Sequence, residues 1–228
     1  LNISRRSFVK SAAAAAAAAF PLAVSRTALG AGARLSANNR ITLGFIGVGK
    51  QARWHLGTFL NYGDVQVVAV CEVDKTRREH AQKKVINKHK SCDASVDFRK
   101  ITSRDDIDAV IIATPDHWHT IPILEACKAK KDIYCEKPLT LTITEAVRAI
   151  EAVKKYKVVF QTGSQQRSSR RFRRACELVR SGRIGTVKTV YANVGGPSRW
   201  CDLPRETMEP GLDWDRWLGP APERPYNS

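Results

Sequence analysis

Three small residues at fixed spacing lie just after a short apolar run, residues 41–46. They belong to the stretch Gly47-Val48-Gly49-Lys50-Gln51-Ala52, which leads into a helix-like segment ending near Leu60. In a GxGxxA order the first glycine permits a tight turn, the second lets a pyrophosphate approach the backbone, and the alanine lets helix and strand pack closely. Because the helix N-terminus also presents free N–H groups, this stretch is expected to bind the phosphates of a dinucleotide.

An acidic residue follows the next strand-like run, residues 65–71. This residue, Glu72, lies 20 positions after Ala52, the spacing at which a carboxylate binds the ribose of a dinucleotide. A surface charge at a strand end is the alternative. Asp74 could take the same role, and a 2′-phosphate would be tolerated by the basic residues Lys75, Arg77 and Arg78. We therefore expect NAD as the first choice of cofactor and NADP as the second.

Polar side chains follow three further strand-like runs, residues 107–113, 131–135 and 158–161. The loops read Thr114-Pro115-Asp116-His117-Trp118-His119, Glu136-Lys137-Pro138 and Gly163-Ser164-Gln165-Gln166-Arg167. Ligands of parallel sheets bind beyond the carboxyl ends of the strands, so these loops are expected to line one site. An ammonium at the edge of such a site can hydrogen-bond a developing alkoxide and move a proton, and Lys137 is the lysine in these loops. An exposed lysine in a turn is the alternative.

Two histidines, His117 and His119, stand two positions apart in the first of these loops. No acid or cysteine accompanies them at ligand spacing, and two ligands do not make a zinc site. We expect both to line the pocket near the cofactor, with ordinary loop histidines as the second interpretation and a metal pair as the third. His55, on the first helix, is interpreted as a packed or capping histidine.

The order of the elements predicts the fold class. Helical patterns separate the strand-like runs: a charged one over residues 76–90, one beginning near Thr120 with Pro122 in its first turn, and one opened by a capping box of Thr142 and Glu145. The helix opened by this capping box has an apolar face formed by Ala146, Val147, Ile150 and Val153. Strict alternation of strand and helix predicts an α/β fold with a doubly wound parallel sheet covered on both faces.

The glycine loop, together with Glu-Lys-Pro after a strand, resembles the glucose-fructose oxidoreductase, inositol dehydrogenase and rhizopine-catabolism family, Gfo/Idh/MocA. The likeness runs from Ile41 through Cys135-Glu136-Lys137-Pro138 to Ser181-Gly182-Arg183-Ile184-Gly185, and the ending, residues 214–222, looks like an exported subgroup. It implies a Rossmann domain followed by an α+β substrate domain, whose Asp and His complete the catalytic set. It also implies that Lys137 lies beside the nicotinamide and the substrate hydroxyl, that Glu136 orients the cofactor or the lysine, and that a cis bond precedes Pro138.

The loops and the resemblance together assign the expected site. Lys137 is expected to be catalytic, and Gln166 and Arg167 are expected to contact the substrate. The expected cofactor-binding residues are Gly47, Val48, Gly49, Lys50, Gln51, Ala52, Glu72, Thr114, Pro115, His119, Glu136, Lys137 and Gln165.

The first 40 residues hold six basic residues and no acid. Among them, Ser4-Arg5-Arg6-Ser7-Phe8-Val9-Lys10 resembles a twin-arginine export signal. The apolar stretch that follows, residues 12–24, contains a proline and is too short to span a bilayer. Residues 31–33 offer a cleavage site, and retention of the signal as an anchor is the alternative. We expect the twin-arginine machinery to export the protein to the periplasm or another extracytoplasmic place. Because that route carries folded proteins, the cofactor is expected to be loaded before export and tightly bound.

The chain has 38 Lys and Arg against 22 Asp and Glu, a formal charge of +16 that invites a nucleic-acid interpretation. Its 43% of hydrophobic residues exclude a disordered chain. The densest basic cluster opens a helix expected from about residue 169 and consists of Arg167, Arg170, Arg171, Arg173 and Arg174. The apolar side of that helix is formed by Phe172, Ala175, Leu178 and Val179. Aromatic residues are sparse there, so we expect a solvated face and no nucleic-acid partner.

Six cysteines are present, with no CxxC pair and no metal-like spacing. Two of them, Cys71 and Cys135, fall inside apolar strand-like runs, where a thiol behaves as a small hydrophobic group. We expect buried thiols rather than a disulfide framework or a metal site.

These features divide the chain into an export signal at residues 1–33, a linker at 34–40, an NAD(P)-binding Rossmann domain at 41–165 and the start of the substrate domain at 166–228. In the last part a strand is expected at residues 186–194. A single strand leaves its backbone and apolar face unpaired, so we expect the chain to be an N-terminal fragment with an incomplete second domain.

The resemblance implies an exported, NAD(P)-dependent oxidoreductase that transfers a hydride between a nicotinamide and a CH–OH group of a sugar or cyclitol. It also implies a homo-oligomer when full length. The alternatives are an NAD-dependent, redox-neutral glycoside hydrolase and a nucleotide-binding module without turnover.

Overall fold

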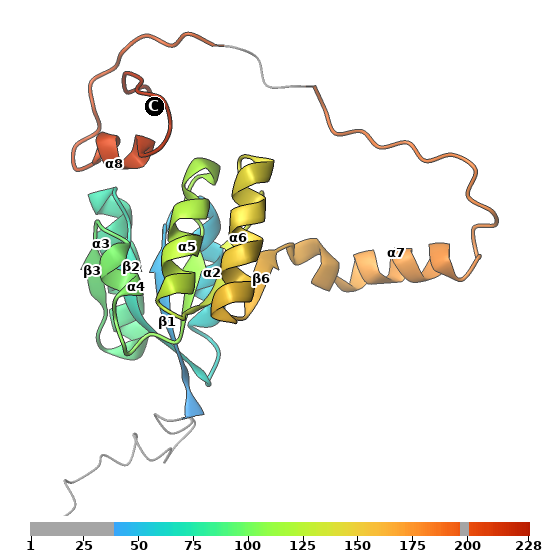
Figure 1. Cartoon of the computed structure of the whole chain (residues 1–228), viewed down its shortest axis with the longest axis horizontal. Helices are drawn as coiled ribbons and strands as arrows, with labels where there is room; N and C mark the ends of the chain where they lie inside the picture. The colour runs from blue at the N-terminus through green and yellow to red at the C-terminus, as the bar shows by residue number, and fades with distance from the viewer. Residues whose placement is uncertain (1–38, 197–200) are drawn as a thin grey trace, which may run out of the picture. The chain divides into compact units, whose positions relative to one another are not determined.

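The computed structural model describes residues 39–196 and 201–228 (Figure 1). The chain divides into two units, residues 1–40 and 41–228, and the strands and helices below belong to the second. The expected export signal and its cleavage site lie outside the described residues. None of the helices in the described ranges has both the length and the apolar character that a bilayer crossing requires.

Six parallel strands form one sheet in the order β3-β2-β1-β4-β5-β6. They are β1 (Ile41–Ile46), β2 (Val65–Cys71), β3 (Asp93–Ser95), β4 (Ala109–Ile112), β5 (Asp132–Glu136) and β6 (Phe160–Gly163). The strand order reverses direction at β1, which puts the switch point between β1 and β4. This sheet confirms the predicted doubly wound fold.

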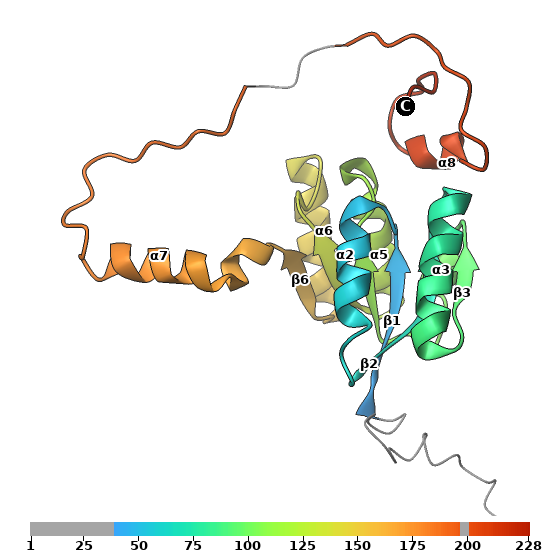
Figure 2. The ribbon, with the colours of Figure 1, turned by 180° about the vertical axis from the view of Figure 1, so that it is seen from behind.

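Helices cover both faces of the sheet, as Figures 1 and 2 show from opposite sides. The helices are α2 (Lys50–Phe59), α3 (Lys75–His89), α4 (Arg99–Thr102), α5 (Thr120–Lys128) and α6 (Ile143–Tyr156). On one face α2 and α3 bury Leu56 and Val85 in a core with β1 and β2. On the other face α4, α5 and α6 bury Ile101, Ile123 and Ala149 in a second core. The two cores fix the strand ends that carry the site.

Local signals set the starts of two helices. The predicted capping box opens α6: Glu145 N donates to Thr142 Oγ1 at 3.2 Å, and Thr142 N donates to Glu145 Oε2 at 2.9 Å. Asp74 caps α3 by accepting a hydrogen bond from Arg77 N at 3.0 Å. Both caps satisfy N–H groups that have no partner within the helix.

The face that α6 buries differs from the prediction. Val147 and Ile150 are 47% and 52% exposed, whereas Ala149 is buried and Val153 packs against the same core. This helix packs on α5, and a small residue at the contact lets two helices approach closely. Val147 and Ile150 therefore turn towards the surface.

No strand forms at residues 186–194, where one was predicted. This segment has no regular structure, and Val190 and Tyr191 are 78% and 94% exposed. A strand needs a neighbour for its backbone hydrogen bonds, and the described residues provide none for this segment. The helix expected before it does form, as α7 (Arg170–Arg180).

Four of the six cysteines are buried free thiols, Cys71, Cys92, Cys127 and Cys135, whereas Cys176 and Cys201 are exposed. The burial predicted for Cys71 and Cys135 is thus confirmed. Removal from water raises the pKa of Cys71, Cys92 and Cys135 to about 12 and that of Cys127 to about 11.

Labelling of the folded protein with iodoacetamide at about pH 8 should modify Cys176 and Cys201 and spare the four core thiols, because the thiolate is the reactive species. All six cysteines should react in denaturant. Peptide mass mapping measures both patterns. Fast labelling of Cys71 or Cys135 in the folded protein would contradict their position in the core.

Candidate functional site

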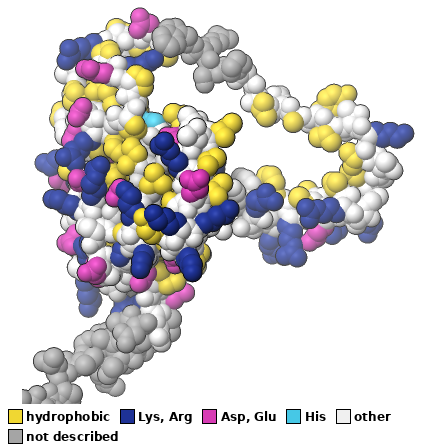
Figure 3. All heavy atoms as spheres, viewed as in Figure 1, with side chains coloured by type: hydrophobic (Ala, Val, Ile, Leu, Met, Phe, Trp, Pro, Cys, Tyr) yellow, Lys and Arg dark blue, Asp and Glu magenta, His cyan; other side chains and the backbone are white. Residues whose placement is uncertain are grey.

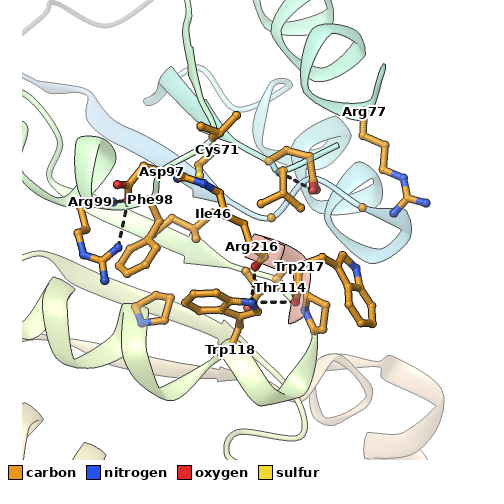
Figure 4. Close-up of a pocket in the computed structure, with 18 of the residues that line it drawn as sticks. Ile46, Cys71, Arg77, Asp97, Phe98, Arg99, Thr114, Trp118, Arg216 and Trp217 are labelled. Carbon is orange, nitrogen blue, oxygen red and sulfur yellow. Dashed lines mark hydrogen bonds and ion pairs between the residues drawn. The ribbon is translucent and has the colours of Figure 1, made fainter. Parts of the chain in front are cut away.

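The carboxyl ends of β1, β2 and β4 border a pocket of about 540 Å³. Its wall includes Gly47, Glu72 and Thr114, which the sequence placed in the site. Figure 4 shows aromatic side chains on the same wall, where Phe98 and Trp118 meet edge to face with ring centroids 6.0 Å apart. The pocket lies at the switch point, where doubly wound sheets bind their ligands.

Two glycines shape the loop between β1 and α2. Gly47 has a φ of +81°, and a Cβ there would lie 2.7 Å from Thr114 N and 2.8 Å from the Ala113 carbonyl oxygen. Gly49 has a φ of −67°, and a Cβ there would meet only Arg77, at 3.8 Å. Gly47 therefore serves the close approach of two loops, whereas Gly49 leaves open space beside the first N–H groups of α2. This space fits a phosphate.

Glu72 follows β2 and borders the pocket. Its carboxylate accepts backbone hydrogen bonds from Val48 N at 2.9 Å, Val73 N at 2.8 Å and Asp74 N at 3.2 Å. The first of these ties the end of β2 to the glycine loop. A carboxylate has about four acceptor positions, so one is left for a ligand hydroxyl. The Asp74 side chain is instead engaged by Arg77, whose Nε lies 3.0 Å away.

Thr114 lies just beyond β4 and also lines the pocket. Its Oγ1 is buried and has no hydrogen-bond partner within the described part of the chain. An unpaired buried hydroxyl costs free energy that a ligand can recover. The open space at Gly49, the acceptor on Glu72 and this hydroxyl together fit the phosphates and ribose of a dinucleotide.

A second polar cluster centres on Glu136, which ends β5 and is 3% exposed. His55 Nε2 lies 2.5 Å from Glu136 Oε1, Gln165 Nε2 donates to the same oxygen, and Gln51 Nε2 lies 3.5 Å from it. Gly163 leaves room for the carboxylate, because a Cβ there would lie 2.8 Å from Oε1. The cluster joins α2, β5 and the 3-10 turn η3 (Gln165–Ser168). It identifies the partner of the packed histidine that the sequence indicated.

Glu136→Gln is expected to lower the free energy of unfolding by about 1–3 kcal/mol, because the new amide NH₂ would face other donors in a buried site. The exposed Glu151→Gln, on α6, is the control and should change it by less than about 0.5 kcal/mol. Urea denaturation followed by circular dichroism measures both. Equal stabilities of the two variants would contradict the role of this carboxylate as a shared acceptor.

Lys137 follows this cluster directly and is exposed, and the Lys137–Pro138 bond is cis, as the resemblance implied. His119 is buried behind the pocket wall: Nδ1 lies 2.8 Å from the Pro138 carbonyl oxygen and Nε2 lies 3.0 Å from the Thr114 carbonyl oxygen. The imidazole therefore joins the loop after β4 to the loop after β5.

The remaining predicted residues are divided between the pocket, the contact of α2 with the sheet, and the surface. Lys50 and Pro115 line the pocket, and Ala52 is fully buried between α2 and the sheet. Gln166 and Arg167 are exposed on η3, outside the pocket wall. The structure thus brings most of the predicted cofactor residues into two adjoining groups and leaves the two predicted substrate residues at the surface.

Three wall residues come from a part of the chain to which sequence reasoning gave no role in the site. Asp215, Arg216 and Trp217 belong to α8 (Trp214–Leu218) and line the pocket beside Trp118. The available signal was the pair of tryptophans in this segment, an aromatic density unusual for a loop.

Basic side chains are spread among acidic ones over the face shown in Figure 3 and gather along α7. On this helix Arg173 and Arg174 lie 2.9 and 3.9 Å from Glu177, and all three are exposed. This exposure agrees with the solvated face predicted for the arginine cluster.

The sheet order, the glycine loop and the pocket define a nucleotide-binding domain of the Rossmann class. A family model described as an oxidoreductase family with an NAD-binding Rossmann fold matches residues 41–164, more than half of the chain. The chain belongs to this Gfo/Idh/MocA family of oxidoreductases. A model of the twin-arginine translocation signal matches residues 2–21.

Relatives of this chain include dehydrogenases and hydrolases. A myo-inositol 2-dehydrogenase of Thermotoga maritima is 31% identical over 144 residues, 63% of this chain and 42% of its own length. A glycosyl hydrolase family 109 protein of Shewanella baltica is 28% identical over 172 residues, 68% of this chain and 38% of its own. The structure of a scyllo-inositol dehydrogenase from Lactobacillus casei with bound NAD(H) and scyllo-inositol matches with a TM-score of 0.59 and 26% identity, over 64% of this chain and 42% of its own. The chain spans about two fifths of the length of these relatives.

Proposed function

We propose that the protein is an exported, NAD(P)-dependent oxidoreductase that transfers a hydride between a nicotinamide and a CH–OH carbon of a sugar or cyclitol. The observation that carries this proposal is the pocket at the switch point, where Gly49, Glu72 and the unpaired Thr114 hydroxyl border one ligand-sized space. The likeness to two inositol dehydrogenases favours a polyhydroxylated substrate.

The residues around the pocket suggest how a dinucleotide would be held. The N–H groups at the start of α2 would bind the pyrophosphate, and Glu72 would bind the hydroxyls of the adenosine ribose. NAD is favoured, because a carboxylate at this position repels a 2′-phosphate. NADP is the second choice, because the Arg77 guanidinium borders the same pocket.

Lys137 is the proposed catalytic residue. When bound, the nicotinamide supplies the carbon that accepts or gives the hydride. Lys137 would hydrogen-bond the reacting hydroxyl and move its proton, and Gln166 and Arg167 would contact the rest of the substrate. The Glu136 cluster, with His55 and Gln165, would hold the end of β5 in place beneath the lysine.

A redox-neutral, NAD-dependent glycoside hydrolase is the second candidate function. The likeness to a glycosyl hydrolase family 109 protein favours it, since that match covers 68% of this chain. Product analysis after incubation of the full-length protein with a glycoside separates the two. Hydrolysis without net oxidation would support the second candidate, and formation of NADH with an oxidised sugar would support the first.

Export in folded form suggests that the cofactor is loaded before export and stays bound. Protein purified from the extracytoplasmic fraction should then carry nicotinamide absorbance and fluorescence after reduction. Purified full-length protein without any bound nicotinamide would contradict tight binding.

A further inference from the structure

The segment at residues 211–219, which includes α8, is docked on the loop between β2 and α3. Lys75 N donates a hydrogen bond to the Gly211 carbonyl oxygen at 3.0 Å. Leu212 adds an isolated antiparallel bridge to Asp74. This loop begins at Glu72, which directly follows β2 and borders the pocket.

The same segment is docked on the loop after β4, on another side of the pocket. Trp118 Nε1 lies 3.0 Å from the carbonyl oxygens of both Arg216 and Trp217, as the dashed lines in Figure 4 show. His117 Nε2 lies 3.0 Å from the Trp217 carbonyl oxygen. The Trp217 ring also stacks on Trp214, with centroids 4.7 Å apart and planes 11° apart. The segment therefore bridges two of the loops that border the pocket.

Gly219 makes the contact between this segment and Trp118 possible. Its φ is +49°, and a Cβ on this residue would overlap the indole ring of Trp118. The ring is thus seated directly against the Gly219 backbone. Any larger residue at this position must displace either the ring or the segment.

The segment also contributes polar groups to the pocket wall. Figure 4 shows Arg216 beside Cys71 at the end of β2. Its Nε lies 3.0 Å from Asp213, and its side chain is 45% exposed. Burial raises the pKa of Cys71 to about 12, and the positive charge of Arg216 acts on the same thiol in the opposite direction. A guanidinium at this place can hydrogen-bond a ribose or stack on a base.

We propose that residues 211–219 form a strap over the adenosine end of the pocket, which contributes Arg216 and Trp217 to nucleotide binding and slows nucleotide release. This inference rests on the proposed function, because it takes the pocket to be the nucleotide site. The adenosine end is the one beside Glu72, since the acid after the second strand binds that ribose. A nucleotide held under the strap leaves only after contacts on one of the two loops break. The family model ends at residue 164, so the strap lies outside the part of the chain that it matches.

The strap is tested by the rate of NADH release. The full chain is loaded with NADH, excess NAD⁺ is added, and the loss of bound-nicotinamide fluorescence is followed. Gly219→Ala is expected to raise the dissociation rate about tenfold, since the new methyl group undocks the strap from Trp118. Gly195→Ala is the matched control, because Gly195 also has a positive φ, +77°, but a Cβ there meets no atom within 4 Å. Its release rate should equal that of the unsubstituted protein.

A second variant separates the side chain from the docking contact. Arg216→Ala keeps the carbonyl oxygen near Trp118 but removes the guanidinium, and it is expected to raise the Kd for NADH by about fivefold to tenfold. The exposed Arg180→Ala, on α7, should leave the Kd unchanged. Unchanged release from Gly219→Ala together with an unchanged Kd for Arg216→Ala would overturn the strap and leave the proposed function standing. Failure of the unsubstituted chain to bind NADH would overturn both.

Discussion

Gly49→Val is expected to weaken NADH binding by about a hundredfold and to leave the free energy of unfolding almost unchanged. The backbone at Gly49 is extended, with φ −67° and ψ −160°, which lies close to the β region that valine favours. The folded protein also has room for the side chain, whose Cβ would meet only Arg77 at 3.8 Å. The same side chain would occupy the space through which a pyrophosphate reaches the N–H groups of α2. Fluorescence titration with NADH and urea denaturation measure the two effects.

Two other glycines provide the controls for this variant. Gly57→Ala, in the last turn of α2, should leave NADH binding unchanged, since the nearest atom to its Cβ is the flexible end of Lys84. Gly47→Ala should instead destabilise the fold, because its positive φ and the backbone of Thr114 both oppose a side chain. NADH binding by Gly49→Val as tight as that of the unsubstituted protein would show that the ligand does not approach this loop.

Lys137→Ala is expected to lower kcat by about 10²–10⁴ in the full-length protein while changing the Kd for NADH by less than about threefold. Lys137 is exposed beyond the end of β5, so its loss should not disturb the core. The adjoining Glu136 carboxylate is already engaged by His55 and Gln165. Steady-state kinetics and an NADH titration measure the two quantities.

Two further substitutions sharpen the test of the lysine. Lys154→Ala, an exposed lysine on α6, is the matched control and should leave kcat unchanged. Lys137→Arg keeps the positive charge but cannot give up a proton near neutral pH, so it should remain as slow as Lys137→Ala. Full activity of Lys137→Arg would overturn proton transfer by this residue, and full activity of Lys137→Ala would overturn its catalytic assignment altogether.

The parts of the fold that carry strong local signals were predictable from the sequence. The run at residues 41–46 meets two glycines and an alanine at fixed spacing, and β1, the turn and α2 follow from these residues alone. The Thr142 and Glu145 pair likewise fixes the start of α6, because both halves of the capping box lie within one turn. Buried strands such as β2 and β4 read as apolar runs of strand length.

Elements that depend on distant partners were not predictable in this way. The strand β3 has only three residues, Asp93–Ser95, and exists because β2 offers it a free edge. Residues 186–194 have the composition of a strand but meet no edge in the described structure. The face of α6 was misjudged for a related reason, since periodicity identifies apolar positions but not the neighbouring helix that selects among them.

The residues of the candidate site also differ in whether local sequence could identify them. The glycine loop, Glu72 and Thr114 were found because each follows a recognisable strand. The contact between His55 and Glu136 joins residues 81 positions apart, and the contact between Trp118 and Arg216 joins residues 98 positions apart. No spacing rule connects such pairs, so the Glu136 cluster and the strap emerge only from the folded chain.

The central claim is that this pocket binds a nicotinamide dinucleotide. Calorimetric titration of the purified protein with NADH, after any bound nucleotide has been removed, tests it most directly. We expect saturable binding of one NADH per chain, competition by NAD⁺ and weaker binding of NADPH, because Glu72 borders the pocket at the ribose position. A folded, monodisperse sample that shows no saturable heat with either nucleotide would contradict the assignment of the pocket.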